Sequence, residues 1–204
     1  MATKEKLRPG IKVLDISCRT GKGSEYFNGK QPGMKFVGMD LTKFMLKLYK
    51  EVMGKTKAQF ETRYFDTYEL PGKDAEFDYV LFFETMEHIS RPDVFLKEIA
   101  RMMKPGAEMI LTTPNIGWEF VHWFAAVTHI HHSEGPHRFL SRAEIIRCIK
   151  NAGLKIKKEE TTVLIPYGPK AVTKFGEFLE RNLKNTVMPI FGLRRIFILT
   201  RIID

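Results

Sequence analysis

The sequence predicts an α/β fold in which a mostly parallel sheet carries helices on both faces. Short apolar runs alternate with segments of helical periodicity, which is typical of such sheets. Several runs are almost continuously apolar, as strands buried on both faces require. With 204 residues, of which 44% are hydrophobic, the chain has the size and composition of one folded domain. We therefore expect a single domain over residues 1–204.

Seven runs are predicted to be strands and five segments to be helices. The strands are expected at residues 11–16, 34–40, 58–66, 77–83, 108–114, 154–166 and 194–202. The helices are expected to open near Thr20–Gly21, after Thr42 and after Ser90 as N-caps, at about 142, and at 169. Ser141 and Glu144 have the spacing of a capping box. Alternating charges early in 154–166 suit a strand at the edge of the sheet.

The net charge of +9 is concentrated in the two ends of the chain. Residues 1–57 carry 13 basic and 5 acidic residues, and residues 167–204 carry 7 and 3, whereas the middle is slightly acidic. A nucleic-acid or anionic-surface partner is compatible with this charge, but its commoner meaning is solubility. A nucleic-acid partner is therefore not favoured.

Cysteine content and hydropathy indicate a reducing compartment. The two cysteines, Cys18 and Cys148, have neither metal-binding spacing nor the pattern of a disulfide framework. No apolar run approaches the about 18 residues of a membrane span, and the polar start lacks the apolar segment of a secretory signal. We expect a cytosolic protein.

Aspartates end three successive predicted strands, at Asp15, Asp40 and Asp66. The carboxyl ends of parallel strands meet at one edge, where open α/β sheets bind ligands. A row of acids there repels itself unless hydroxyl or amino donors meet it. Asp40 lies 19 residues after Gly21, close to the about 20 at which an acid reaches the ribose of a bound dinucleotide. The sequence thus predicts a site for a ligand rich in hydroxyl and amino groups.

The segment VLDISCRTG resembles the strand and turn of class I S-adenosylmethionine-dependent methyltransferases, which have an acid and then Gly-x-Gly-x-Gly. Ser17 and Arg19 replace two of the glycines and Gly21 is kept. VGMD, YFD, FDYVLFFETMEHI, FLKEIARMMKPGAEMILTTPN and GPHRFLSRAEIIRCIKNAGLKI follow in the order of that family, over nearly the whole chain. The likeness is to the ubiquinone-biosynthesis and type 11 members. It implies a Rossmann-like seven-stranded sheet whose last strand is antiparallel.

The same resemblance implies a site for S-adenosyl-L-methionine. Asp15 would face its methionine end through the turn, Asp40 would bind the ribose hydroxyls, and Asp66 would accept from the adenine amino group. Arg19 brings a side chain where the family lets backbone approach the ligand, and its guanidinium could pair with the cofactor carboxylate. The other implied cofactor residues are Ser17, Cys18, Gly21, Leu41, Thr67 and Phe83.

Methyl transfer from a sulfonium requires mainly alignment of acceptor and methyl group. We expect a small-molecule or lipid-like acceptor and no metal. A base is needed only if the acceptor is a hydroxyl or phenol, and the candidates by position are His88, His137 and Glu84. The aromatic segment 116–140 is expected to be an insertion or lid over the acceptor. A buried core or dimer element and a weak membrane-surface contact are its alternatives.

Two other functions stay open. Glu84, Glu87, His88 and a later His137 resemble the metal-binding pattern of small-RNA 3′-end 2′-O-methyltransferases, which would make the chain a metal-assisted RNA 2′-O-methyltransferase. The same Glu-x-x-Glu-His is equally common in relatives that bind no metal. The third hypothesis is a non-catalytic relic of the fold with weakened cofactor binding. Ion-dependent activity would favour the RNA hypothesis, and the absence of calorimetric heat with S-adenosylmethionine would favour the relic.

Overall fold

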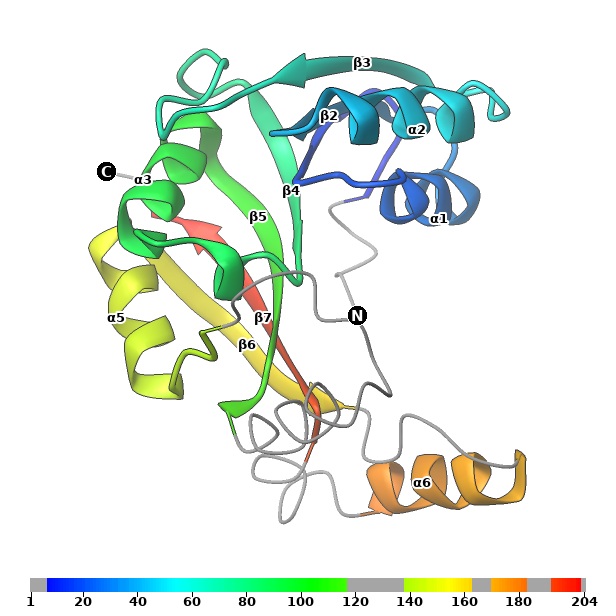
Figure 1. The fold of residues 1–204 in the computed structure, drawn as a ribbon, viewed down its shortest axis with the longest axis vertical. Coiled ribbons are helices and arrows are strands. Elements are labelled where there is room, and N and C mark those ends of the chain that lie inside the picture. The colour runs from blue at the N-terminus through cyan, green and yellow to red at the C-terminus, as the bar shows by residue number, and fades with distance from the viewer. Residues whose placement is uncertain (1–6, 117–137, 163–169, 183–191, 203–204) are drawn as a thin grey trace.

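A computed structural model describes residues 7–116, 138–162, 170–182 and 192–202. Figure 1 shows a twisted sheet with the strand order β3-β2-β1-β4-β5-β7-β6. The strands are β1 Lys12–Ile16, β2 Lys35–Asp40, β3 Gln59–Tyr64, β4 Phe77–Phe83, β5 Met103–Pro114, β6 Leu154–Thr162 and β7 Arg194–Arg201. The helices are α1 Lys22–Lys30, α2 Lys43–Met53, α3 Pro92–Met102, α5 Arg142–Asn151 and α6 Lys170–Asn182, with a 3-10 turn, η1, at Met86–His88.

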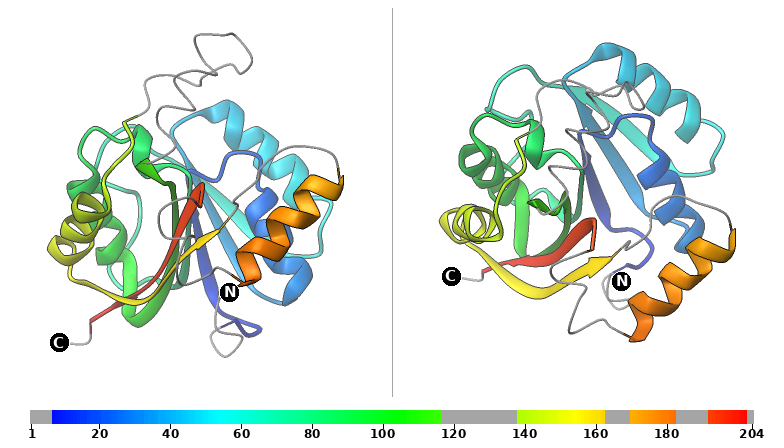
Figure 2. Two further views of the ribbon diagram at one scale, coloured as in Figure 1. Left: turned by 90° about the horizontal axis from the view of Figure 1, so that it is seen from below. Right: turned by 60° about the horizontal axis from the view of Figure 1, so that its bottom comes forward.

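The topology confirms the predicted fold class. Strands β1 to β5 all run parallel to one another. Strand β7 lies between β5 and β6 and is antiparallel to both. Figure 2 shows α1 and α2 on one face of the sheet and α3 and α5 on the other. From β1 the chain adds β2 and β3 on one side and then returns to add β4 and β5 on the other. The strand order therefore reverses between β1 and β4.

Each face of the sheet has its own hydrophobic core. Leu14 and Ile16 of β1 pack with α3 and α5, whereas Val13 packs with α2. Because side chains alternate along a strand, Asp15 shares the face of Val13 and points toward α1 and α2. Among residues of α2, the buried ones are Leu46, Tyr49 and Met53.

Two of the three predicted caps differ in detail from the structure. The capping box of α5 is confirmed, since Ser141 accepts from the Glu144 amide and Glu144 accepts from the Ser141 amide. Thr42 occupies the N-cap of α2 but makes no side-chain bond to it; its hydroxyl donates to Asp40 instead. The prediction of Ser90 as N-cap was wrong by one residue, because Arg91 holds that position and Pro92 begins α3.

Two strand boundaries also differ from the expectation. The third strand ends at Tyr64, two residues before the expected end, and the fifth begins at Met103 directly after α3 rather than at 108. Strand β6 is at the edge of the sheet, as its charges predicted. Most of segment 116–140, the expected lid, lies outside the described residues. No helix in the described ranges is long and apolar enough to cross a membrane.

Candidate functional site

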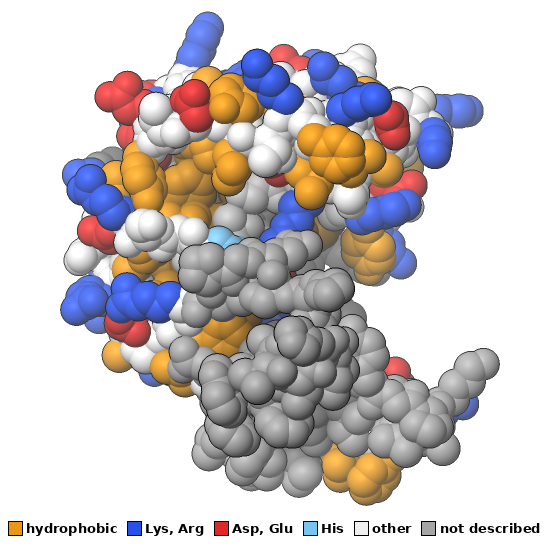
Figure 3. Space-filling view, in the orientation of Figure 1, with side chains coloured by type: hydrophobic (Ala, Val, Ile, Leu, Met, Phe, Trp, Pro, Cys, Tyr) orange, Lys and Arg blue, Asp and Glu red, His pale blue; other side chains and the backbone are white. Residues whose placement is uncertain are grey.

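A cavity of about 400 Å³ opens at the carboxyl ends of the parallel strands. It lies beside the reversal of strand order, where open α/β sheets bind their ligands. Figure 3 shows hydrophobic side chains gathered on this face of the molecule. Five of the predicted site residues line the cavity. The five are Ser17, Leu41, Asp66, Thr67 and His88.

The cavity also has an apolar wall that the sequence analysis did not assign. Phe65 and Tyr68, from the loop after β3, and Ile89 and Phe95, from the segment after β4, complete it. Phe95 forms aromatic contacts with both Phe65 and Tyr68, at centroid distances of 5.8 and 6.2 Å. Their signal in the sequence is the apolar character of the loop residues that follow two strands. Such a wall suits a flat, partly apolar ring.

The turn between β1 and α1 keeps the backbone of a glycine-rich turn with only one glycine. Ser17, Arg19 and Gly21 have φ values of 53°, 46° and 76°, in the left-handed region that favours glycine. For the two residues that carry a Cβ, this conformation costs about 1–2 kcal/mol each. The Ser17 hydroxyl is buried without a hydrogen-bond partner, although Ser17 lines the cavity.

The Arg19 side chain reaches across the carboxyl edge of the sheet. Its guanidinium donates to the carbonyl oxygen of Glu84, at 3.2 Å. Arg19 does not line the 400 Å³ cavity. Its amide donates to Asp40 at 3.0 Å, so the residue links the turn to both β2 and the end of β4.

The Asp40 carboxylate is buried and already holds three donors. It accepts from the Arg19 amide and from both the amide and the hydroxyl of Thr42, each at 3.0 Å. Asp40 has a relative exposure of 4%. Asp40 therefore fixes the turn against the start of α2, and a carboxylate with about four acceptor positions keeps room for one more donor.

Asp15 lies beneath the turn. Its carboxylate accepts from the Ser24 hydroxyl at 2.7 Å, and the Ser24 hydroxyl accepts from Tyr49 at 2.9 Å. Burial raises the pKa of Asp15 to about 7; the Ser24 bonds oppose the rise and the charge of Asp40 adds to it. Asp15 is thus held inside the α1–α2 layer.

Acidic residues follow β4 at Glu84 and Glu87. Glu84 accepts from the Thr112 hydroxyl at 2.6 Å and pairs with Arg194 at 3.1 Å. The Glu87 side chain is only 3% exposed, and its Oε2 has no hydrogen-bond partner. Burial raises the pKa of Glu87 to about 7; a backbone hydrogen bond at Glu87 opposes the rise, Glu84 adds to it, and Arg19 and Arg194 oppose it. His88 Nε2 lies 4.0 Å from the other oxygen of Glu87.

The remaining predicted residues lie elsewhere. The Phe83 ring stacks on Phe27 at 6.4 Å and borders Gly23, so it supports α1. Cys18 is buried, and burial raises the pKa of its thiol. His137 lies outside the described residues. Within the described residues, no group of three or more His, Cys, Asp or Glu side chains could hold a metal ion.

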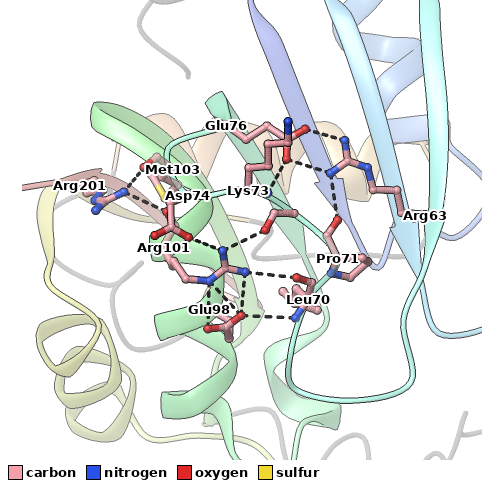
Figure 4. Close-up of polar contacts among 11 residues, drawn as sticks. Arg63, Leu70, Pro71, Lys73, Asp74, Glu76, Glu98, Arg101, Met103 and Arg201 are labelled. Atoms are coloured by element: carbon pink, nitrogen blue, oxygen red, sulfur yellow. Dashed lines mark hydrogen bonds and ion pairs between the residues drawn. The ribbon is translucent and has the colours of Figure 1, made fainter.

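The loop that brings Asp66 and Thr67 to the cavity is anchored at its far end, as Figure 4 shows. Arg101 donates to the carbonyls of Leu70 and Gly72 and pairs with Asp74 and Glu98. Arg63 donates to the Pro71 carbonyl and pairs with Glu76. Arg63 is the main reason that the pKa of Glu76 is lowered to about 2. These contacts hold the loop between β3 and β4 in place.

A doubly wound sheet with a tight turn before α1 and a cavity at its carboxyl edge defines an α/β domain of the Rossmann-like class. The comparison with family models is more specific. Residues 1–159 match the model described as "Methyltransferase domain", and the chain belongs to that family.

Relatives and solved structures agree with this membership. The chain is 27% identical over 165 residues to a ubiquinone biosynthesis O-methyltransferase of Nitrobacter winogradskyi, covering 78% of this chain and 62% of the relative. It is 27% identical over 136 residues to a fatty-acid O-methyltransferase of Mycolicibacterium smegmatis, covering 67% and 47%. The chain thus spans less than two thirds of the length of these relatives.

Solved structures show the same fold. A SAM-dependent methyltransferase from Aquifex aeolicus superposes with a TM-score of 0.65 at 18% identity, covering 98% of this chain and 87% of the other. Phosphoethanolamine N-methyltransferase 2 of Haemonchus contortus, solved with S-adenosylhomocysteine, gives a TM-score of 0.69 at 17% identity, covering 96% and 50%.

Proposed function

We propose that this chain is an S-adenosylmethionine-dependent methyltransferase that methylates an oxygen atom of a small-molecule or lipid-like acceptor. The observation that carries the proposal is the cavity at the carboxyl edge, which gathers Leu41, Asp66 and Thr67 beside the β1–α1 turn. Relatives named as O-methyltransferases of ubiquinone biosynthesis and of fatty acids support the reaction and the kind of acceptor.

The residues present suit an adenosine group. Leu41, which is 56% exposed, and Ile89 offer apolar surface to a flat ring, and Asp66 offers an acceptor for an exocyclic amine. Ser17 lines the same cavity, and its unpartnered hydroxyl could bond a ribose hydroxyl. Arg19 would supply a positive charge for the methionine carboxylate. When bound, the cofactor supplies an activated sulfonium methyl, so no covalent enzyme intermediate is needed.

A hydroxyl acceptor must lose its proton, and the described groups best placed to take it follow β4. Glu84 is already engaged by Thr112 and Arg194, which leaves it less suited than the sequence alone indicated. Glu87 combines a spare carboxylate oxygen with a pKa of about 7, and general bases work best when their pKa is near the working pH. His88 is its neighbour and lines the cavity. The lid, the role of His137 and the cytosolic location stay predictions.

Calorimetric titration with S-adenosylhomocysteine tests the proposal. Asp66→Ala should weaken binding by about 1–3 kcal/mol, because an amine loses a charged acceptor. Because Asp66 is exposed, the free energy of unfolding should barely change. Glu51→Gln, which removes an exposed acid on α2 outside the cavity, is the matched control. The absence of binding to the unaltered protein would leave only the non-catalytic relic.

Labelled methyl transfer would then define the acceptor. A prenylated catechol and a long-chain fatty acid serve as probes of the lipid-like class, and a short RNA duplex with and without Mn²⁺ represents the alternative. Methylation of RNA alone would overturn the proposed acceptor.

A further inference from the structure

The ring of Tyr49 is wedged between the β1–α1 turn and β2. Tyr49 is completely buried. A Cβ at Gly38, on β2, would lie 2.7 Å from the nearest atom of this ring, and a Cβ at Gly21 would lie 2.8 Å from it. Because real Cβ atoms do not approach so closely, both positions require glycine for as long as the ring is there. The last glycine of the turn therefore rests directly on Tyr49.

The hydroxyl of the same residue begins a chain of hydrogen bonds that ends under the turn. Tyr49 donates to the Ser24 hydroxyl at 2.9 Å, and Ser24 donates to the Asp15 carboxylate at 2.7 Å. Ser24 is fully buried and Asp15 is 4% exposed. The chain crosses from α2 through α1 to β1. Since a hydroxyl that donates is a better acceptor, the two bonds strengthen each other.

The other groups around Asp15 do not favour its ionised form, so its negative charge depends on the hydrogen bonds from Ser24. From β2 comes Asp40, whose negative charge raises the pKa of Asp15, and the turn contributes Cys18, which feels the charge of both acids. On the β4 side Asp15 is paired in register with Leu81, and the Phe83 ring borders Gly23 beside it. Hydrogen bonds from Ser24 are the interactions that lower the pKa of Asp15.

We propose that Tyr49 is a positioning residue for the cofactor site: its ring supports the turn from below, and its hydroxyl, through Ser24, orients the Asp15 carboxylate. This inference rests on the proposed function and on the role that the family resemblance implies for Asp15, which would face the methionine end of the cofactor through the turn. It assigns a role in cofactor binding to a residue of α2 that does not line the cavity.

Tyr49→Phe removes the hydroxyl and keeps the ring, so it tests the hydrogen bond alone. Tyr79→Phe is its matched control. Tyr79 is also completely buried, but its hydroxyl has no hydrogen-bond partner. Affinity for S-adenosylhomocysteine would be measured by calorimetry from pH 6 to 9. Binding by the unaltered protein should weaken as the pH falls below about 7, because Asp15 takes up a proton.

In Tyr49→Phe, affinity at pH 7 should fall about 3- to 10-fold. The pH midpoint should move upward, because the ionised carboxylate has lost indirect support. Tyr79→Phe should change neither. Ser24→Ala should move the midpoint in the same direction, and adding Tyr49→Phe to it should have little further effect, since the two act in one chain. An unchanged midpoint in Tyr49→Phe, or an equal shift in Tyr79→Phe, would overturn the proposal.

Urea unfolding across the same pH range tests the role of Tyr49 independently of cofactor binding. A carboxyl whose pKa is raised on folding stabilises the protein fully below its unfolded pKa, and this contribution is lost as the pH rises through the folded pKa. Tyr49→Phe should shift that loss to higher pH. If the unaltered protein did not bind S-adenosylhomocysteine, the proposed function would fail, and the unfolding profile would still decide whether Tyr49 controls Asp15.

Discussion

Two buried carboxyl groups at the same edge of the sheet, Asp15 and Glu87, have similar burial and different surroundings. Their relative exposures are 4% and 5%, and burial raises the pKa of each to about 7. Asp15 accepts a hydrogen bond from Ser24, which Tyr49 supports. Glu87 keeps an oxygen without a hydrogen bond.

The difference separates two uses of a buried acid. A carboxylate whose donors come from the fold itself is part of the scaffold, and its geometry is set before any ligand arrives. A buried polar atom without a partner is uncommon and calls for an explanation. Under the proposed function, that explanation at Glu87 would be a hydroxyl donor on the acceptor.

The scaffold side of this comparison is tested most strongly by Gly38→Ala. The new Cβ would meet three atoms of the Tyr49 ring within 2.9 Å, so the ring must shift and strain its bond to Ser24. We expect a loss of about 2–3 kcal/mol in the free energy of unfolding, measured with urea. Gly29→Ala, at a helix position with nothing within 4 Å of the new Cβ, should be neutral or stabilising by up to about 1 kcal/mol. Equal effects of the two changes would show that Tyr49 does not support the turn.

Glu87→Gln tests the other side. The pKa of the Glu87 carboxyl is raised from 4.5 to about 7 on folding. The stability that this carboxyl contributes is therefore complete below about pH 4.5 and is lost as the pH rises through 7. The amide cannot ionise, and the variant should therefore be more stable than the unaltered protein at pH 8, by about 1–3 kcal/mol. At pH 4 the advantage should disappear. Urea unfolding at several pH values measures this, with Glu51→Gln as control; a constant difference between pH 4 and 8 would contradict the assignment.

Arg19→Gly should have the smallest effect on stability. Glycine adopts the φ of 46° without strain, while the lost bond to the Glu84 carbonyl is exposed and long, at 3.2 Å. We expect a gain of at most about 1 kcal/mol. Arg19→Ala loses the same side chain but keeps the strain, so it should be less stable than the glycine variant. A glycine variant less stable than the unaltered protein in thermal unfolding would mean that the guanidinium contributes more than the backbone conformation costs.

The strands were predictable because hydrophobic periodicity is local, whereas their ends depend on distant partners. Strand β3 stops at Tyr64 because its partner in β2, Asp40, is the last residue of that strand. Strand β5 begins at Met103 because Phe77 pairs with it. The wrong cap at Ser90 could have been avoided, since proline favours the first helical position and Pro92 therefore points to Arg91.

Part of the cavity wall was predictable from the sequence, whereas the hydrogen bonds behind it were not. Asp66, Leu41 and Thr67 reach the cavity that their positions after strands implied. The donors to Asp15 and Asp40 could not be inferred, because they come from other elements and from backbone amides. Tyr49 was missed because helical spacing grouped Met45, Leu48 and Val52 on one face of α2, whereas the structure buries Leu46, Tyr49 and Met53.

The direction of β7 has a consequence for the synthesis of the chain. Because it runs against β5, its beginning meets the end of that strand, and Arg194 comes to stand beside Glu84. Strand β6 has β7 as its neighbour in the sheet. A ribosome must therefore synthesise β7 before β5 and β6 can be joined in one sheet. Until then β5 exposes an unpaired edge, and this interval is when a nascent chain is most exposed to aggregation.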